Sequence, residues 1–452
     1  MVTPEPRTLT QDDLSVPTLG APGLFSPLAL STVRDDQIAD FVPDDARVAM
    51  TVETTAGAPR LDSLLFEKAG PRARIFFDPA RTRAAVVTCG GLSPGINNVV
   101  RAMVLELHYK YGVREILGYR YGFEGLNARV GMQPLRLGPD EVRSVHTQGG
   151  SFLGLSRGQQ DVGLMVDTLE RDRVDAFFVI GGDGTLRGAG TISAEIRRRG
   201  AQIAVVGVPK TIDNDVAYVD KTFGFETAVE VARMAIDGAH AEAVSARNGV
   251  AIVKLMGRES GFVAAAATTA SAEVNFCLVP EVRFELDGPD GLLVALEKRL
   301  HERSHAVIVV AEGCGATLVD YVHGEVERDA SGNVRYGSQE ADIGPRLRDA
   351  IVAHFKRVSM PVTVKYIDPS YMIRSVPANA GDSIFCDTLG RHAVHAAMAG
   401  KTSIAIGRWH RVFTHVPLSV ATSFRKRIDP DRTTWLAVTE TTGQPRLVNA
   451  RP

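Results

Sequence analysis

Cysteine is scarce in this chain of 452 residues, and its four copies are far apart. Cys89, Cys277, Cys314 and Cys386 form no CxxC pair, and their spacings fit no zinc module. This scarcity argues against both a disulfide framework and a cysteine-based zinc site. We expect reduced thiols in a cytoplasmic protein.

The chain also has little net charge and no long apolar run. The formal charge is -2, so no general attraction to nucleic acid or to an anionic membrane is expected. No apolar run approaches the ~20 residues of a membrane span. The opening segment MVTPEPRTLTQDD lacks the basic and apolar regions of a signal peptide. We therefore expect a soluble protein that gathers its basic residues locally, around a phosphorylated ligand.

What the chain does contain is an alternation of short apolar runs and helical patterns. The run at 83–89 precedes a glycine-rich turn and a helical pattern, and 174–182 followed by 185–200 repeats that order. The pattern resumes after a long helix predicted near 226–247. Such alternation predicts an α/β fold with parallel sheets flanked by helices, here in two lobes joined near Phe225. A polar excursion is predicted at 323–339.

Polar segments follow the apolar runs. In open parallel sheets, ligands bind beyond the carboxyl ends of the strands. The segments at these ends are rich in Gly, Asp, Glu, Arg or Tyr, and this shared character predicts one shared cleft. They read CGGLSPGINN, IGGDGTLRG, VPKTIDND, LMGRESGF, VAEGCG and YIDPSYMIR.

Two of these segments have the composition of phosphate-binding turns. CGGLSPGINN places glycines between a strand and a helix, but it lacks the GK[ST] ending of a P-loop, so a plain tight turn is an equal alternative. GGDGT adds Asp183, a hard oxygen ligand of the kind that binds Mg²⁺ together with substrate phosphates. The alternative is that Asp183 and Thr185 only cap the following helix.

The remaining segments carry charged groups with less specific patterns. In PKTIDND, Asp213 could accept a proton from an alcohol during phosphoryl transfer, or the segment could be a polar turn. Arg258 and Arg374 could hold phosphate, or they could form ordinary surface salt bridges. Glu312 could accept hydrogen bonds from sugar hydroxyls, or it could act as a cap.

In order and spacing, these segments resemble the phosphofructokinases, from about Phe76 to Lys401. The resemblance implies two similar α/β lobes with the active site in the cleft between them. It implies an N-terminal extension at 1–80 and a nucleotide-binding lobe at 81–225, completed by about 378–425. It further implies a sugar-phosphate-binding lobe at 226–377 and a C-terminal tail at 426–452.

The resemblance also implies roles for individual residues. Asp213 matches the general base, with Thr211 and Arg258 as its catalytic partners, and Asp183 matches the magnesium ligand. The nucleotide phosphate site would comprise Gly91, Arg157, Gly158, Gly182, Asp183, Gly184 and Thr185. The sugar phosphate site would comprise Thr211, Ile212, Asp213, Met256, Gly257, Arg258, Glu312, Tyr371, Met372, Ile373 and Arg374.

The phosphoryl donor depends on two positions. Members that use pyrophosphate typically have an aspartate where Gly184 stands and a lysine where Lys210 stands, and small bacterial ATP enzymes have glycine at both. The mixed pattern resembles a longer ATP-dependent group of plants, protists and some bacteria. An acid at 184 would crowd and repel the α-phosphate of ATP, so we expect MgATP as donor and fructose 6-phosphate as acceptor, in glycolysis. A pyrophosphate-dependent enzyme is the alternative.

Other possibilities stay open at this point. A different GGDGT kinase, acting on NAD or a lipid, would explain Asp183 but leave TIDND, MGRES and YMIR unused. A sugar phosphate sensor without catalysis is a third possibility. The family also leads us to expect a homo-oligomer, a dimer or tetramer, under allosteric control, although no effector site can be matched. His392 and His395 are predicted to lie on a helix surface rather than to bind a metal.

Overall fold

The computed structural model describes residues 8–53, 63–315 and 342–449. The chain divides into two compact units. Unit 1 comprises 1–211, 216–224 and 376–425, and unit 2 comprises 212–215, 225–375 and 426–452. The polar excursion predicted at 323–339 lies outside the described residues. None of the described helices is both long and apolar enough to cross a membrane.

Unit 1 is built on a mixed sheet. Its central strands β14, β9, β8, β5 and β6 are parallel, and β15, β3, β2 and β7 join its two edges in antiparallel fashion. The sheet order is β2 (Arg47–Ala49), β3 (Leu65–Lys68), β15 (Val412–Pro417), β14 (Ile404–Trp409), β9 (Ala204–Pro209), β8 (Ala176–Gly181), β5 (Arg83–Thr88), β6 (Glu115–Tyr119) and β7 (Leu135–Arg136). A separate pair is formed by β1 (Leu24–Phe25) and β4 (Arg74–Ile75).

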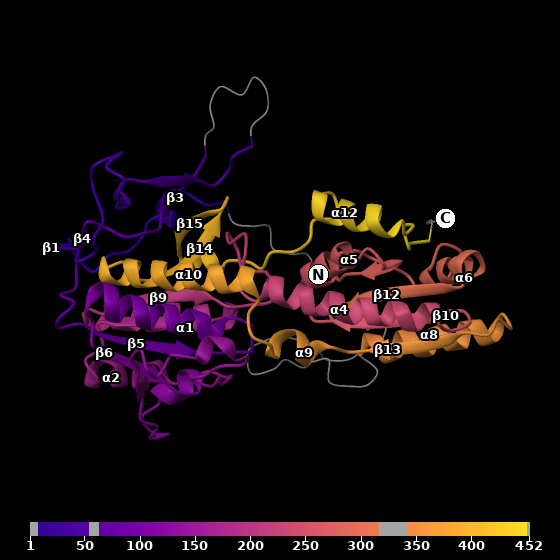
Figure 1. The fold of residues 1–452 in the computed structure, drawn as a ribbon, viewed down its shortest axis with the longest axis horizontal. Helices are drawn as coiled ribbons and strands as arrows, with labels where there is room; N and C mark the ends of the chain where they lie inside the picture. The colour runs from indigo at the N-terminus through magenta and orange to yellow at the C-terminus, as the bar shows by residue number, and fades with distance from the viewer. Residues whose placement is uncertain (1–7, 54–62, 316–341, 450–452) are drawn as a thin grey trace. The chain divides into compact units, whose positions relative to one another are not determined.

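Helices cover both faces of this sheet. The unit 1 helices are α1 (Ile96–Leu105), α2 (Val162–Arg171), α3 (Asp183–Arg199), α10 (Ala380–Met398) and α11 (Leu418–Ala421), with short turns η1 (Asp12–Leu14), η2 (Glu106–Tyr111), η3 (Gly122–Leu126) and η4 (Val145–Thr147). Alternate residues of β5 enter two different cores, because successive side chains of a strand point to opposite faces. Helices α1 and α10 lie side by side on one face (Figure 1), and α2 packs against α3 on the other.

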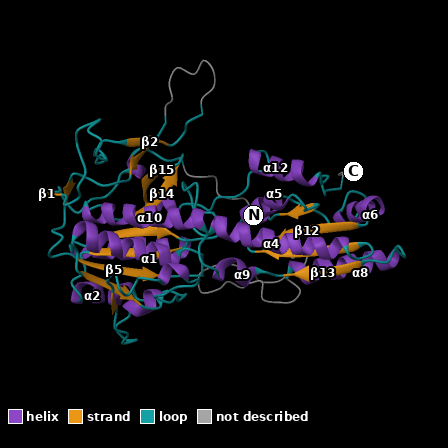
Figure 2. Cartoon of the chain, viewed as in Figure 1, coloured by secondary structure: helices purple, strands orange, loops and turns teal. Residues whose placement is uncertain are grey.

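Unit 2 contains a smaller, fully parallel sheet. Its order is β11 (Phe276–Leu278), β12 (His305–Ala311), β10 (Gly249–Leu255) and β13 (Thr363–Ile367). Its helices are α4 (Phe225–Val244), α5 (Phe262–Ser271), α6 (Leu292–Arg303), α8 (Ile343–Arg357), α9 (Ser370–Ser375) and α12 (Thr433–Thr442), and Figure 2 shows them against the strands. The two central strands are buried almost throughout, which explains why they read as continuous apolar runs.

The predicted α/β fold with parallel sheets flanked by helices is confirmed. The structure adds the antiparallel edges of the unit 1 sheet. Strands β2 and β3 come from the N-terminal extension and pair through β3 with β15. The C-terminal segment 426–452 belongs to unit 2, where α12 packs against α5.

One prediction about surface residues is wrong. His395 is 8% exposed, and its Nδ1 lies 2.9 Å from the hydroxyl oxygen of Tyr111. The ring of His392 lies 4.5 Å from that of Phe413. Both histidines face the interior because α10 packs against α1 as well as the sheet, so more of its circumference is covered than a surface helix would show. The four cysteines are all buried, and none is joined in a disulfide.

Candidate functional site

The glycine-rich segments of unit 1 meet at the carboxyl ends of its parallel strands. Strands β5, β8 and β9 are adjacent and parallel, so their carboxyl ends lie together. Gly90 follows β5, Thr185 lies in the first turn of α3 after β8, and Lys210 follows β9. A Cβ placed on Gly90 would lie 3.7 Å from the Nζ of Lys210 and 3.8 Å from the Oγ1 of Thr185. The structure thus brings three separate segments to one point.

Lys210 has a structural contact in this cluster. Its side chain is buried, and its ammonium donates a hydrogen bond to the carbonyl oxygen of Gly91, at 2.5 Å. Its backbone N–H donates to the carbonyl oxygen of Gly181, at 2.9 Å. The lysine therefore ties the end of β9 to the glycine turn after β5 and to the end of β8.

The segment with Arg157 and Gly158 joins the same cluster. The backbone N–H of Gly90 donates to the carbonyl oxygen of Ser156, at 3.0 Å. Gly158 has a φ of +108°, and the space where a Cβ would stand is open. A backbone of this kind, left-handed and without a side chain, lets an anionic group approach closely.

Asp183 is the first residue of α3, and Gly184 is exposed in the same turn. The Oδ2 of Asp183 lies 3.1 Å from the Nε of Arg187 and 3.5 Å from a guanidinium nitrogen of Arg425. Within the described ranges, no group of three or more histidines, cysteines or acids could hold a metal. A single carboxylate nevertheless fits a Mg²⁺ ion whose other ligands are phosphate oxygens and waters.

Arg425 is a site residue that the sequence did not identify. It lies in the last fifty residues, which carry no recognised motif, yet unit 1 places it beside Asp183. The only available signal was the basic run Arg425–Lys426–Arg427.

In unit 2, the Met256–Gly257–Arg258 segment follows β10. Gly257 has a φ of +132°, and a Cβ there would lie 2.4 Å from the carbonyl oxygen of Ser260, so this turn requires glycine. The Nε of Arg258 lies 3.4 Å from an Oε1 of Glu312, which follows the adjacent strand β12. The two strand ends therefore present an arginine and an acid side by side.

Glu312 is held in an unusual environment. Burial raises the pKa of its carboxyl above the ordinary value, and the positive charges of Arg258 and Lys254 oppose that rise. Asp213 belongs to the same unit, and its carbonyl oxygen accepts a hydrogen bond from the Ser260 hydroxyl, at 3.3 Å. Asp213, Arg258 and Glu312 are thus linked through the turn after β10.

Helix α9 carries the last predicted group. Tyr371 and Met372 are largely exposed, and the guanidinium of Arg374 lies 5.1 Å from the centre of the Tyr371 ring. Ile373 and Ile212 are instead buried in the apolar core of unit 2, so only their backbones are available to a ligand.

Two further predicted residues lie outside α9. In unit 1, Thr211 accepts a hydrogen bond from the Thr222 hydroxyl through its carbonyl oxygen, at 2.7 Å. Met256 is half-buried against the unit 2 core.

Sequence reasoning also missed Lys254. It is the sixth residue of the buried strand β10 and is 9% exposed. Its ammonium contacts two carboxylates, those of Asp342 at 3.0 Å and Asp368 at 2.9 Å. A lysine inside a continuous apolar run was the available signal, because a buried lysine requires acidic partners.

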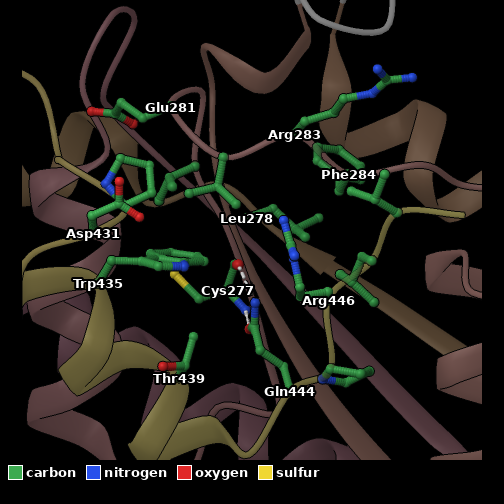
Figure 3. Close-up of a pocket in the computed structure, with 16 residues that line it drawn as sticks. Cys277, Leu278, Glu281, Arg283, Phe284, Asp431, Trp435, Thr439, Gln444 and Arg446 are labelled. Carbon is green, nitrogen blue, oxygen red and sulfur yellow. Dashed lines mark hydrogen bonds between the residues drawn. The ribbon is translucent and has the colours of Figure 1, made fainter. Parts of the chain in front are cut away.

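A cavity of about 500 Å³ in unit 2 involves none of the predicted site residues. It lies between the segment after β11 and the C-terminal chain, with Trp435 and Arg446 among its lining side chains (Figure 3). The Gln444 side chain exchanges hydrogen bonds with the backbone of Cys277, accepting at 2.6 Å and donating at 3.2 Å. These bonds hold the C-terminal segment against β11. The Gln444 amide takes the place of the backbone groups that another strand would offer to Cys277.

Comparison with known proteins places this architecture in a family. The model of the phosphofructokinase family matches residues 83–397. The chain belongs to the phosphofructokinase family, as its motifs predicted. The match covers the ends of all the strands that carry the predicted site residues from Gly91 to Arg374.

Two similar proteins match this chain over nearly their whole length. The chain is 49% identical to the ATP-dependent 6-phosphofructokinase of Amycolatopsis methanolica, over 97% of this chain and 96% of that protein. It is 45% identical to the ATP-dependent 6-phosphofructokinase of Borreliella burgdorferi, over 96% and 97%. Among solved structures, the pyrophosphate-dependent phosphofructokinase of Marinobacter aquaeolei has a TM-score of 0.63 at 20% identity, covering 77% of this chain and 86% of that one. That structural likeness concerns the fold alone.

Proposed function

We propose that this protein is an ATP-dependent 6-phosphofructokinase of glycolysis. It would transfer the γ-phosphoryl group of MgATP to the 1-hydroxyl of fructose 6-phosphate, giving fructose 1,6-bisphosphate and ADP. The observation that carries this proposal is the glycine-lined cluster at the ends of β5, β8 and β9, with Gly184 exposed beside Asp183. The relatives named above as ATP-dependent 6-phosphofructokinases support the same donor and acceptor.

The nucleotide would bind through backbone groups of unit 1. Gly158 leaves open space where a phosphate could approach, Gly91 and Gly182 would offer backbone groups, and the N-terminus of α3 favours negative charge. Asp183 would hold the magnesium ion together with the donor phosphates. When bound, that ion offsets the charge that develops on the transferred group.

The acceptor would bind through unit 2. Arg258 and Arg374 would bind phosphate oxygens, and Glu312 would accept hydrogen bonds from the sugar hydroxyls. In the transfer, the bond from the sugar O1 to the γ-phosphorus forms while the bond to the bridging oxygen of ADP breaks. Asp213 takes the proton of the 1-hydroxyl, and Arg258 stabilises the charge on the moving phosphoryl group. We also propose that the protein is a homo-oligomer, as the family resemblance implies, and that it is cytoplasmic, since its cysteines form no disulfide.

An acceptor assay tests this proposal. Purified protein with MgATP is given fructose 6-phosphate, glucose 6-phosphate or NAD, and the phosphorylated product is identified by mass spectrometry. We expect fructose 1,6-bisphosphate and an equal amount of ADP with the first acceptor only. Turnover of NAD without turnover of fructose 6-phosphate would instead support a different GGDGT kinase, and binding of the sugar phosphate without turnover would support a sensor.

A further inference from the structure

Lys254 connects three parts of unit 2. It lies two residues before Met256, near the end of β10, and only 11% of its side chain is exposed. Its ammonium hydrogen-bonds both carboxylate oxygens of Asp342, each at 3.0 Å, and lies 2.9 Å from the Oδ2 of Asp368. A buried ammonium held between two carboxylates is fixed in position, because moving it away from either one would give up a charge-assisted contact.

Each acidic partner controls the start of a different helix. Asp342 is the N-cap of α8, where its side chain accepts a hydrogen bond from the backbone N–H of Gly344, at 3.1 Å. Asp368 accepts from the backbone N–H of Ser370, at 3.1 Å, and from the Ser370 hydroxyl. Because Ser370 opens α9, the carboxylate of Asp368 fixes the first turn of that short helix.

Helix α9 needs such support. It has only six residues, and Ile373 is its one buried side chain. Isolated helices of this length are unstable in water. The packing of α9 against α4, the burial of Ile373 in the core and the ion pair of Asp368 with Lys254 therefore hold Tyr371 and Arg374 in place.

We propose that Lys254 is a positioning residue for the sugar phosphate, acting through Asp368 and α9. The lysine fixes α9 relative to the end of β10, so that Arg374 and Arg258 present their guanidinium groups at a constant separation. This inference rests on the proposed function, since it assigns the sugar phosphate to these arginines. Lys254 itself does not touch the substrate.

The kinetic signature of this role is specific. Replacing the ammonium by an apolar group leaves the carboxylates of Asp342 and Asp368 facing each other without a cation, which drives the start of α9 away from β10. Misplacing a binding group by about 1 Å can cost up to ~100-fold. Lys254→Met should therefore raise the KM for fructose 6-phosphate roughly ten- to hundredfold, while the KM for MgATP stays within about twofold.

The two acidic partners separate positioning from general stability. Asp368→Asn should reproduce a rise in the KM for fructose 6-phosphate, because a neutral amide holds the Lys254 ammonium less strongly than a carboxylate and so weakens the link to α9. Asp342→Asn should leave that KM near the wild-type value, although both variants lower the melting temperature. Lys298→Met, at an exposed position on α6, is the matched control and should change neither KM.

The experiment is a set of steady-state assays on the full-length wild type and these four variants, with circular dichroism to confirm folding. If Lys254→Met does not fold, Asp368→Asn decides the question, since it leaves Lys254 paired with Asp342. An unchanged KM for fructose 6-phosphate in Asp368→Asn, or an equal rise in Asp342→Asn, would overturn the proposal. Failure of the wild type to phosphorylate fructose 6-phosphate would refute the proposed function instead.

Discussion

Lys210 and Gly184 gave conflicting indications of the phosphoryl donor, and the contacts of Lys210 ease that conflict. Its ammonium binds the Gly91 carbonyl oxygen and so has a task in holding the glycine turn. That task does not depend on which donor occupies the site. Gly184 is exposed in the first turn of α3. We therefore infer that position 184 carries the donor preference.

This inference predicts the effect of adding an acid at position 184. Gly184→Asp should lower kcat/KM for MgATP roughly tenfold or more, because a like charge beside the nucleotide phosphates repels them. Thr191→Asp is the matched control, since it adds the same charge at an exposed position two turns along α3. Equal kinetics for the two variants would contradict a local charge effect at position 184.

Asp213 is the residue on which the proposed chemistry depends most. Asp213→Asn keeps the shape of the side chain but cannot take the proton of the sugar hydroxyl. Turnover should fall roughly a hundredfold or more, as expected for loss of a general base. Binding of fructose 6-phosphate, measured by calorimetry, should be largely kept.

The control for this substitution is Asp220→Asn, which removes an acid at an exposed position seven residues further along. It should leave turnover close to the wild-type value. Full activity in Asp213→Asn would remove Asp213 as the base and would revive the interpretation of PKTIDND as a polar turn.

At the scale of the element, a buried histidine of α10 makes the stability of the fold depend on pH. Burial lowers the pKa of His395 to about 3, helped by the nearby charges of His392, Arg391 and Arg72. The folded protein therefore keeps this histidine neutral, whereas the unfolded chain protonates it below about 6.5. Since the unfolded state binds more protons, stability should fall as the pH drops below 6.5, by about 1.4 kcal/mol per pH unit for this one group.

His395→Gln tests this dependence, because glutamine can still hydrogen-bond the Tyr111 hydroxyl but does not titrate. The melting temperature of the variant, measured by calorimetry from pH 7 to pH 5, should fall less steeply than that of the wild type. His301→Gln, on the exposed face of α6, should keep the wild-type slope. Parallel curves for the wild type and His395→Gln would show that His395 does not contribute.

The elements show which parts of this molecule the sequence could predict. Buried parallel strands appear in the sequence as unbroken apolar runs, and ligand-binding residues follow their carboxyl ends. The segments around Gly91, Asp183 and Arg258 could therefore be found from the pattern. Ion-pair partners that come from distant positions in the chain could not be predicted in this way. Lys254 and Asp342 are 88 residues apart, and Arg425 joins Asp183 from a segment without a motif.

The sequence pattern also did not predict which helix faces are buried. The sequence predicted that His392 and His395 lie on a helix surface, but α10 packs against α1 and η2, and residues of η2 enclose His395. The same holds for Ile373, which the YMIR motif groups with Arg374 but which the fold assigns to the core. Motifs identify segments, whereas tertiary packing decides which side chains of a segment can reach a ligand.

At the scale of the whole molecule, each unit carries the residues that we propose for one kind of phosphate chemistry. Unit 1 gathers glycine turns and Asp183, which suit a nucleotide with magnesium, and unit 2 gathers arginines and Glu312, which suit a sugar phosphate. For the whole enzyme, the fold alone does not fix the donor, because ATP and pyrophosphate enzymes share it. The ATP-dependent relatives and Gly184 indicate MgATP.

The most direct test is a comparison of the two donors on one preparation of the wild-type protein. Initial rates of fructose 1,6-bisphosphate formation are measured at saturating fructose 6-phosphate, with MgATP or magnesium pyrophosphate varied separately. We predict that kcat/KM for MgATP exceeds that for pyrophosphate roughly a hundredfold or more, as repulsion and fit at position 184 require. Turnover with pyrophosphate and none with MgATP would contradict the account.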